Sequence, residues 1–106
     1  MKKVVREEKE DAVKELYEAL LLLKTTDEIS RFFNDLCTPK EIKSLGERWR
    51  VCKLLDQGSL SYRDINNLTG ASLVTIGRVA RFLKTEPHHG YALILDRLAK
   101  KNKRTT

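Results

Sequence analysis

The stretch SYRDINNLTGASLVTIGRVARFL, residues 61–83, decides the fold because it reads as two short helices joined by a tight turn. Ser61 is placed to cap the first helix, with Asp64 favouring the same end electrostatically. Gly70 follows where the chain needs a left-handed or closely approached backbone, and Ser72 is placed to cap a second helix. The pattern predicts a helix-turn-helix over residues 61–84.

The second of these helices has an apolar stripe and a different outer face. The stripe recurs at helical spacing and consists of Leu73, Ile76, Val79, Ala80 and Leu83. The outer face is small and hydrogen-bonding at its start and basic further on; it consists of Val74, Thr75, Gly77, Arg78, Arg81 and Lys84. Such a face suits insertion into a DNA major groove flanked by phosphates. An ordinary surface helical hairpin is the alternative interpretation.

Length and charge fit one small basic domain over residues 1–106. Residues 1–38 carry 7 basic and 9 acidic side chains, a net charge of −2, whereas residues 39–106 carry 14 and 6, a net charge of +8. The basic part contains the predicted helix pair. This asymmetry favours a polyanionic partner, although lysines scattered over solvated faces give the same totals.

Other classes of function find no support in the residues. No apolar run approaches the ~20 residues of a membrane span, and no signal-peptide segment opens the chain, so we expect a cytoplasmic protein without a membrane partner. Cys37 and Cys52 do not form a CxxC pair, and we expect no metal site. Paired acids, a Cys–His pairing and a glycine-rich phosphate loop are all missing from the pattern, so we predict no catalytic residue and no enzyme.

The rest of the chain predicts further helices without strands. Residues 1–6 read as a loose arm, 7–58 as dimerisation and core helices, 91–99 as a C-terminal helix and 100–106 as a basic tail. The first helix is apolar almost all round at Ala19–Leu23, which indicates either a deeply packed helix or one shared with a second copy. Thr25 with Glu28, and Thr38 with Pro39 and Glu41, signal the starts of the next two helices.

Together these segments resemble the Trp repressor family, and more closely its YerC/YecD-type branch. The resemblance runs from the first helix to Leu98 and is carried by RFFNDLCTPKEI (31–42), SLGER (44–48), TGAS (69–72), VTIGRV (74–79), GY (90–91) and LDRL (95–98). It implies an all-α, six-helix fold whose N-terminal helices intertwine in a homodimer. It also implies a transcriptional regulator, expected to be a repressor, that binds double-stranded DNA at a pseudo-palindromic operator.

The resemblance also assigns roles to residues of the helix pair. Leu73, Val74 and Thr75, with Gly77 one turn on, match positions that face base edges. Tyr62, Arg63, Asn66 and Lys84 match positions that look towards phosphates and groove edges, and we add Arg81 as a phosphate contact. Because Leu73 and Val74 are apolar where polar base readers are expected, a helical protein-protein interaction module that has kept the fold is the alternative function.

A possible effector cleft follows from the same resemblance. Arg48 and Arg78 match the two arginines that hold tryptophan in the family's named member, and Thr38 matches its corner threonine. Val79 and Phe82 replace a glycine and a serine and should occupy the indole's space, and Trp49 adds aromatic mass. We therefore predict no cofactor and no response to tryptophan, and leave another small effector open. From the sequence alone, we expect Arg48 and Arg78 to bond acidic side chains or to contact phosphate rather than to hold an effector.

Overall fold

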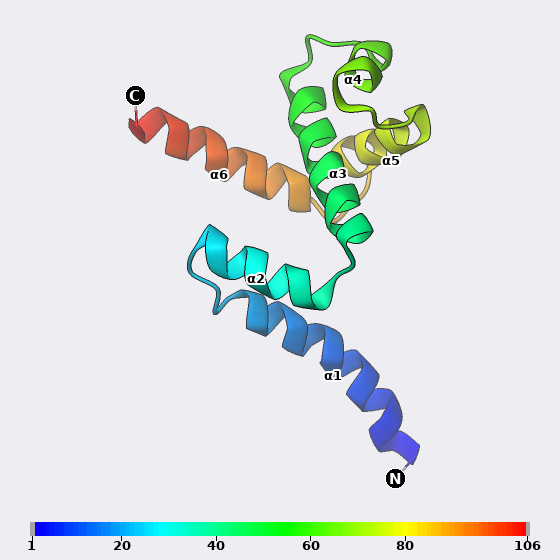
Figure 1. Ribbon diagram of the computed structural model, residues 1–106, viewed down its shortest axis with the longest axis vertical. Helices are drawn as coiled ribbons and strands as arrows, with labels where there is room; N and C mark the ends of the chain where they lie inside the picture. Colours follow the sequence, from blue (N-terminus) through cyan, green and yellow to red (C-terminus); the bar gives the residue numbers. More distant parts are fainter. Residues whose placement is uncertain (1, 106) are drawn as a thin grey trace. The chain divides into compact units, whose positions relative to one another are not determined.

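The computed structural model describes the backbone of residues 2–105 and the side chains of residues 11–103. Over this range the chain forms six α-helices and no strand (Figure 1), which confirms the predicted all-α architecture. The helices are α1 (Lys2–Leu20), α2 (Thr26–Leu36), α3 (Pro39–Gln57), α4 (Tyr62–Thr69), α5 (Leu73–Lys84) and α6 (Gly90–Thr105). Contacts divide the chain into two compact units, residues 1–42 and residues 43–106, which are described separately.

Helix α1 differs from its prediction at both ends. It starts at Lys2, so residues 2–6 of the predicted loose arm are helical, and residue 1 lies outside the described residues. This stretch contains no glycine or proline, and extending a helix that already exists adds one hydrogen bond for each residue fixed. The helix ends at Leu20, and Leu21 and Leu22 project from the turn that follows with 84% and 75% of their surface exposed.

The next two helices begin as their capping residues predict. The Thr25 Oγ1 accepts the Glu28 N–H at 3.1 Å at the start of α2. At the start of α3, Thr38 Oγ1 accepts the Glu41 N–H at 3.2 Å, and the Glu41 carboxylate accepts the Thr38 N–H at 2.8 Å. The hydrogen bond from the Thr38 N–H to the Glu41 carboxylate is the largest of the causes that lower the pKa of Glu41. Both starts are therefore fixed by neighbours in the chain.

The first unit buries little of its apolar surface. None of residues 11–42 is fully buried, and the least exposed apolar side chains of α1 and α2 are only half-buried; these are Leu16, Ala19, Leu20, Phe32 and Phe33. Val13 and Tyr17 of α1 are exposed. Within one chain, this helix pair lacks a covered core.

The second unit has a compact core where α3, α4 and α5 meet. Its buried members are Val51, Cys52, Leu55, Ile65, Ala71, Ile76, Val79 and Ala80. The apolar stripe of α5 is buried at Ile76, Val79 and Ala80, but its first residue, Leu73, is exposed, and so is Leu45 of α3. Figure 1 shows α4 and α5 lying beside the C-terminal part of α3, so this core holds the helix pair against α3.

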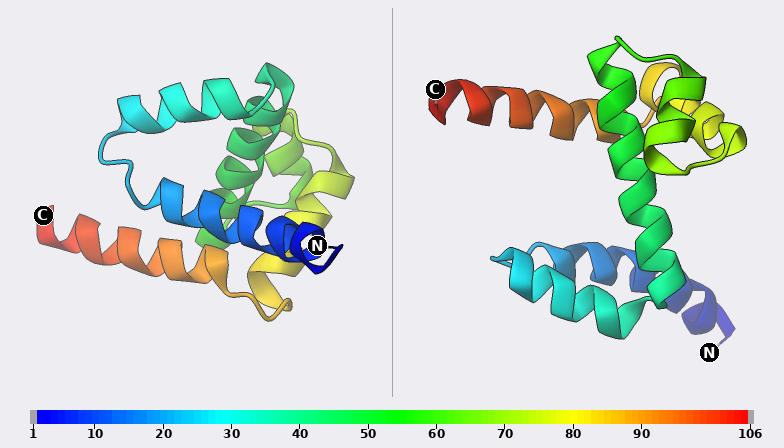
Figure 2. Two further views of the ribbon diagram at one scale, coloured as in Figure 1. Left: turned by 90° about the horizontal axis from the view of Figure 1, so that it is seen from below. Right: turned by 45° about the horizontal axis from the view of Figure 1, so that its top comes forward.

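Helix α6 is longer than predicted. It spans Gly90–Thr105, so the helix predicted for residues 91–99 continues through most of the predicted basic tail. An ion pair at 3.1 Å joins Lys100 to Asp96 one turn earlier, and no helix breaker intervenes. Figure 2 shows the C-terminal part of α6 extending away from α3, α4 and α5.

Candidate functional site: the α4–α5 pair and the adjoining cavity

Helix α4 is held at both ends by its own sequence. Ser61 Oγ accepts the Asp64 N–H at 3.1 Å, and the Asp64 carboxylate accepts the Ser61 N–H at 3.1 Å. The hydrogen bond from the Ser61 N–H to the Asp64 carboxylate is the largest of the causes that lower the pKa of Asp64. At the other end, Gly70 has φ +77°, and its N–H donates to the Asn66 carbonyl at 2.9 Å. The predicted cap and left-handed glycine are both confirmed.

The turn between α4 and α5 is tied by side chains as well as by backbone. Asn66 Nδ2 donates to the Ala71 carbonyl at 2.7 Å, and the Ala71 N–H donates to Thr69 Oγ1 at 3.0 Å. Thr69 Oγ1 in turn donates to the Ile65 carbonyl at 2.7 Å. Asn66, predicted to face phosphates or groove edges, therefore also fixes the turn. The two helices are held as one rigid pair.

Helix α5 begins at a second serine cap and presents an exposed first turn. Ser72 Oγ accepts the Thr75 N–H at 3.1 Å and also donates to Thr75 Oγ1 at 3.1 Å. Leu73 and Val74 have 58% and 82% of their surface exposed, Thr75 is half-buried, and Gly77 adds no side chain. The predicted base-facing residues thus lie together on one exposed turn.

The predicted phosphate-facing residues fall into two groups. Tyr62, Arg63 and Lys84 are exposed, and neither Arg63 nor Lys84 has an ion-pair partner among the side chains of residues 11–103. Arg81, in contrast, lies 3.6 Å from the Glu86 carboxylate and 5.0 Å from the Phe82 ring centre. Among the predicted phosphate-facing residues, Arg63 and Lys84 are therefore cations that an outside anion can reach without breaking an ion pair.

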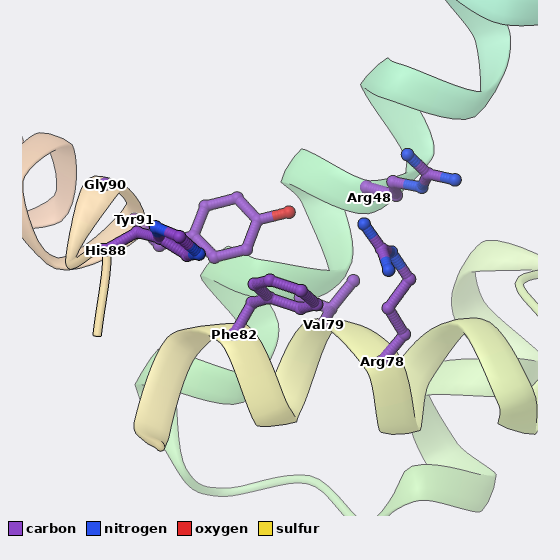
Figure 3. A pocket seen from close by; sticks show the side chains of 7 residues that line it. All are labelled: Arg48, Arg78, Val79, Phe82, His88, Gly90 and Tyr91. Carbon is purple, nitrogen blue, oxygen red and sulfur yellow. The ribbon is translucent and has the colours of Figure 1, made fainter. Parts of the chain in front are cut away.

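A cavity of about 280 Å³ lies beside the helix pair (Figure 3). It is lined by Arg48 of α3, by Arg78, Val79 and Phe82 of α5, by His88, and by Gly90 and Tyr91 of α6. Four of the five residues predicted for the effector cleft therefore come together. The fifth, Thr38, belongs to the first unit, where it caps α3.

The cavity is cationic, with no carboxylate among its lining residues. Figure 3 shows the side chains of Arg48 and Arg78 at the same end of the cavity, with the Tyr91 hydroxyl directed toward that end. Neither arginine forms an ion pair with any of the side chains described, so the acidic partners that we expected are not found there. The Arg78 guanidinium instead lies 4.5 Å from the Phe82 ring centre. Two guanidinium groups without ion-pair partners in one cavity favour the binding of an anion there.

Aromatic side chains shape the cavity differently from the prediction. Phe82 stacks on His88 with ring centres 6.1 Å apart, and Val79 is buried, yet open space remains beside them. Trp49 does not line the cavity; it stacks on Tyr91 at 6.3 Å. His88, Gly90 and Tyr91 were missed because the sequence marks residues 85–90 only as a turn and Tyr91 only as a core-facing position.

Comparison with known proteins places this architecture in one class. The fold is that of an all-α, Trp-repressor-like protein, and the Trp repressor protein family matches residues 11–99. The chain belongs to the Trp repressor family. No helix within residues 2–105 is long and apolar enough to cross a membrane, and residues 11–103 contain no group of three or more metal-ligating side chains.

Relatives and solved structures agree with the family. The chain is 43% identical to the YerC protein of Bacillus subtilis (strain 168) over 84 residues, 79% of each protein. A crystal structure of a TrpR-like protein from Eubacterium eligens is 44% identical with a TM-score of 0.79, over 84% of this chain and 90% of that one. A crystal structure described as that of a Trp repressor from Staphylococcus aureus is 42% identical in sequence with a TM-score of 0.78, over 84% of this chain and 87% of that one.

Proposed function

We propose that the protein is a sequence-specific transcriptional repressor that binds DNA as a homodimer, with the α4–α5 pair as its helix-turn-helix. The observation that carries the proposal is the exposed first turn of α5 on a rigid, doubly capped pair, which also carries the unpaired cations Arg63 at the start of α4 and Lys84 at the end of α5. A helix of this kind enters the major groove with its N-terminal residues, while the preceding helix crosses the backbone. Access to DNA also supports the expected cytoplasmic location, and we assign no catalytic activity.

The homodimer follows from the uncovered apolar surface of the first unit. Residues 11–42 have no fully buried side chain, and Val13, Tyr17, Leu21 and Leu22 are exposed. Exposed apolar surface of this kind is costly in water, and a second copy supplies a matching surface. Two copies related by a twofold axis read half-sites roughly 34 Å apart, so the operator is pseudo-palindromic.

The direct test is selection of bound duplexes from random DNA, followed by affinity measurements at several salt concentrations. We expect an enriched palindrome whose affinity falls with salt, because phosphate contacts release counterions. Arg63→Ala should lower the slope of log K against log salt by about one unit. Arg31→Ala is the matched control, because Arg31 lies on α2 and faces Asp27 at 3.9 Å.

The same experiment distinguishes the proposed repressor from the alternative function, a helical protein-protein interaction module. If selection enriches no sequence while the purified protein captures a stable protein partner through Leu73 and Val74, the chain is a helical interaction module and the proposal is overturned. An enriched palindrome with an unchanged salt slope in Arg63→Ala overturns only the phosphate role of Arg63.

A second role is supported by the cavity. We propose that it takes a small effector with a carboxylate or phosphate group held by Arg48 and Arg78, and that this effector is not tryptophan. Val79 and Phe82 border a space of about 280 Å³, which is at the lower end of ligand-pocket volumes. Calorimetric titration with anionic metabolites should give binding that Arg48→Met abolishes, whereas L-tryptophan should give none. Saturable tryptophan binding lost in Arg48→Met contradicts the exclusion of tryptophan.

A further inference from the structure

The first turn of α5 carries apolar side chains at its most exposed positions. Val74 is 82% exposed and Leu73 is 58% exposed, and neither can donate or accept a hydrogen bond. Gly77, one turn on, has no side chain. The surface expected to meet base edges is therefore mainly aliphatic.

The neighbouring polar side chains are already engaged within the protein. Thr75 Oγ1 accepts a hydrogen bond from Ser72 at 3.1 Å, which leaves its own proton to donate. Arg78 turns to the cavity and stacks on Phe82, as Figure 3 shows. Arg81 faces Glu86. The long arginine side chains that usually read guanine are thus held away from the exposed first turn.

The four bases respond differently to such a surface. In the major groove thymine presents a methyl group and an O4 acceptor, whereas cytosine presents an N4 amino donor. An aliphatic side chain gains from covering the methyl group, but it leaves the cytosine amino group buried without a partner. The Thr75 proton suits the thymine O4. Thymine is the base whose methyl group matches the aliphatic surface and whose O4 can accept a hydrogen bond from a donor beside it.

Resting on the proposed function, we infer that Leu73 and Val74 recognise thymine methyl groups, so that each half-site carries thymine under the first turn of α5. Two aliphatic side chains on a helix pair that also carries the unpaired cations Arg63 and Lys84 suit a base edge of DNA better than a protein partner. A stable protein interface buries more than about 1,000 Å², far more than these two side chains provide.

The test replaces single thymines of the selected operator by deoxyuridine, which removes the methyl group and leaves pairing and charge unchanged. Removing one contacted methyl group should weaken binding about fourfold, the transfer free energy of one such group expressed as an affinity ratio. Replacement in both half-sites should weaken binding about sixteenfold. Deoxyuridine outside the contacted positions should have no effect.

Variants assign the effect to the side chains. In Val74→Ala the deoxyuridine penalty should shrink at one thymine of each half-site, because fewer atoms remain to cover the methyl group. Val74 is so exposed that this change leaves the fold intact. Leu68→Ala is the matched control, because Leu68 is a 54% exposed leucine on α4 and should leave the penalty unchanged.

The outcomes separate this inference from the proposed function. Specific operator binding that deoxyuridine does not weaken at any position overturns the thymine inference and leaves the repressor intact. A penalty unchanged in both Leu73→Ala and Val74→Ala also overturns it. Absence of specific binding to any duplex overturns both proposals.

Discussion

The same substitution should have opposite effects at two glycines of the α4–α5 pair. An added Cβ meets no heavy atom within 4 Å at Gly70 or at Gly77, so the consequence of glycine to alanine depends on backbone conformation alone. Gly70 has φ +77°, where an L-residue is disfavoured by about 1–2 kcal/mol. Gly77 lies inside α5, where alanine is favoured over glycine by about 0.8–1 kcal/mol.

Gly70→Ala should therefore lower the free energy of unfolding by about 1–2 kcal/mol, and Gly77→Ala should raise it by about 0.8–1 kcal/mol. For a chain of this length the first variant loses about 4–8 °C in Tm and the second gains about 4 °C. Urea unfolding followed by far-UV circular dichroism measures both, at one protomer concentration because a dimer's stability depends on concentration.

Gly70→Asn is the matched control, since asparagine tolerates the left-handed region better than alanine and should fall between alanine and the wild type. A neutral Gly70→Ala, or shifts of the same sign in both alanine variants, refutes the reasoning from backbone conformation. DNA affinity supplies a second readout: Gly77→Ala adds a methyl group to the proposed DNA face and should bind the operator more weakly although it is more stable.

Three further predictions concern the caps and a buried thiol. Ser72→Ala should cost about 1 kcal/mol of stability and weaken operator binding, whereas Ser61→Ala should cost a similar amount with a smaller effect on binding. Hydrogen bonds from Ser61 lower the pKa of Asp64, so the Asp64 carboxylate contributes fully to stability above its ordinary pKa of 3.8, and this contribution is lost as pH falls through the lowered pKa. Asp64→Asn lacks the contribution, so its acid unfolding curve should show less destabilisation over that pH range than the curve of the wild type. Burial, assisted by the charge of Asp56, raises the pKa of the Cys52 thiol from 9.0 to about 11. Cys37 should therefore react first with iodoacetamide. As pH rises from 9 to 11, the wild type should lose stability relative to Cys52→Ala, because the buried thiol resists ionisation in the folded state.

The features that local sequence determines were predicted well. The Ser61 cap, the Thr38 cap and the left-handed Gly70 each depend on residues within a few positions in the chain, so the pattern names both partners. The N-terminal extent of α1 and the C-terminal extent of α6 were underestimated because the pattern marks apolar faces, whereas a helix continues through polar residues until something stops it.

The features that depend on tertiary packing were predicted only in part. Resemblance supplied four residues of the cavity, but His88 and Tyr91 join it through the turn into α6, which no local pattern describes. The exposure of Leu45 and Leu73 has a related cause. Periodicity identifies an apolar stripe without identifying what covers it, and within one chain neither leucine is covered.

Helix α5 carries the cavity and the proposed DNA face on one rigid element, which limits how an effector can act. Arg78, at the cavity, lies one turn from Thr75, but the Asn66–Ala71 and Thr69–Ala71 hydrogen bonds bind α4 to the start of α5. A ligand shifts a conformational equilibrium of a protein only if it binds the two conformations with different affinities. Because the α4–α5 pair is rigid, its two conformations differ in the position of the pair against α3 and α6. An anion between Arg48 and Arg78 should therefore alter the spacing of the two α4–α5 pairs in the proposed homodimer without altering the bases that each pair prefers. Operator selections with and without the effector should return the same half-site with a different tolerance for spacing, and a changed half-site would contradict the rigid pair.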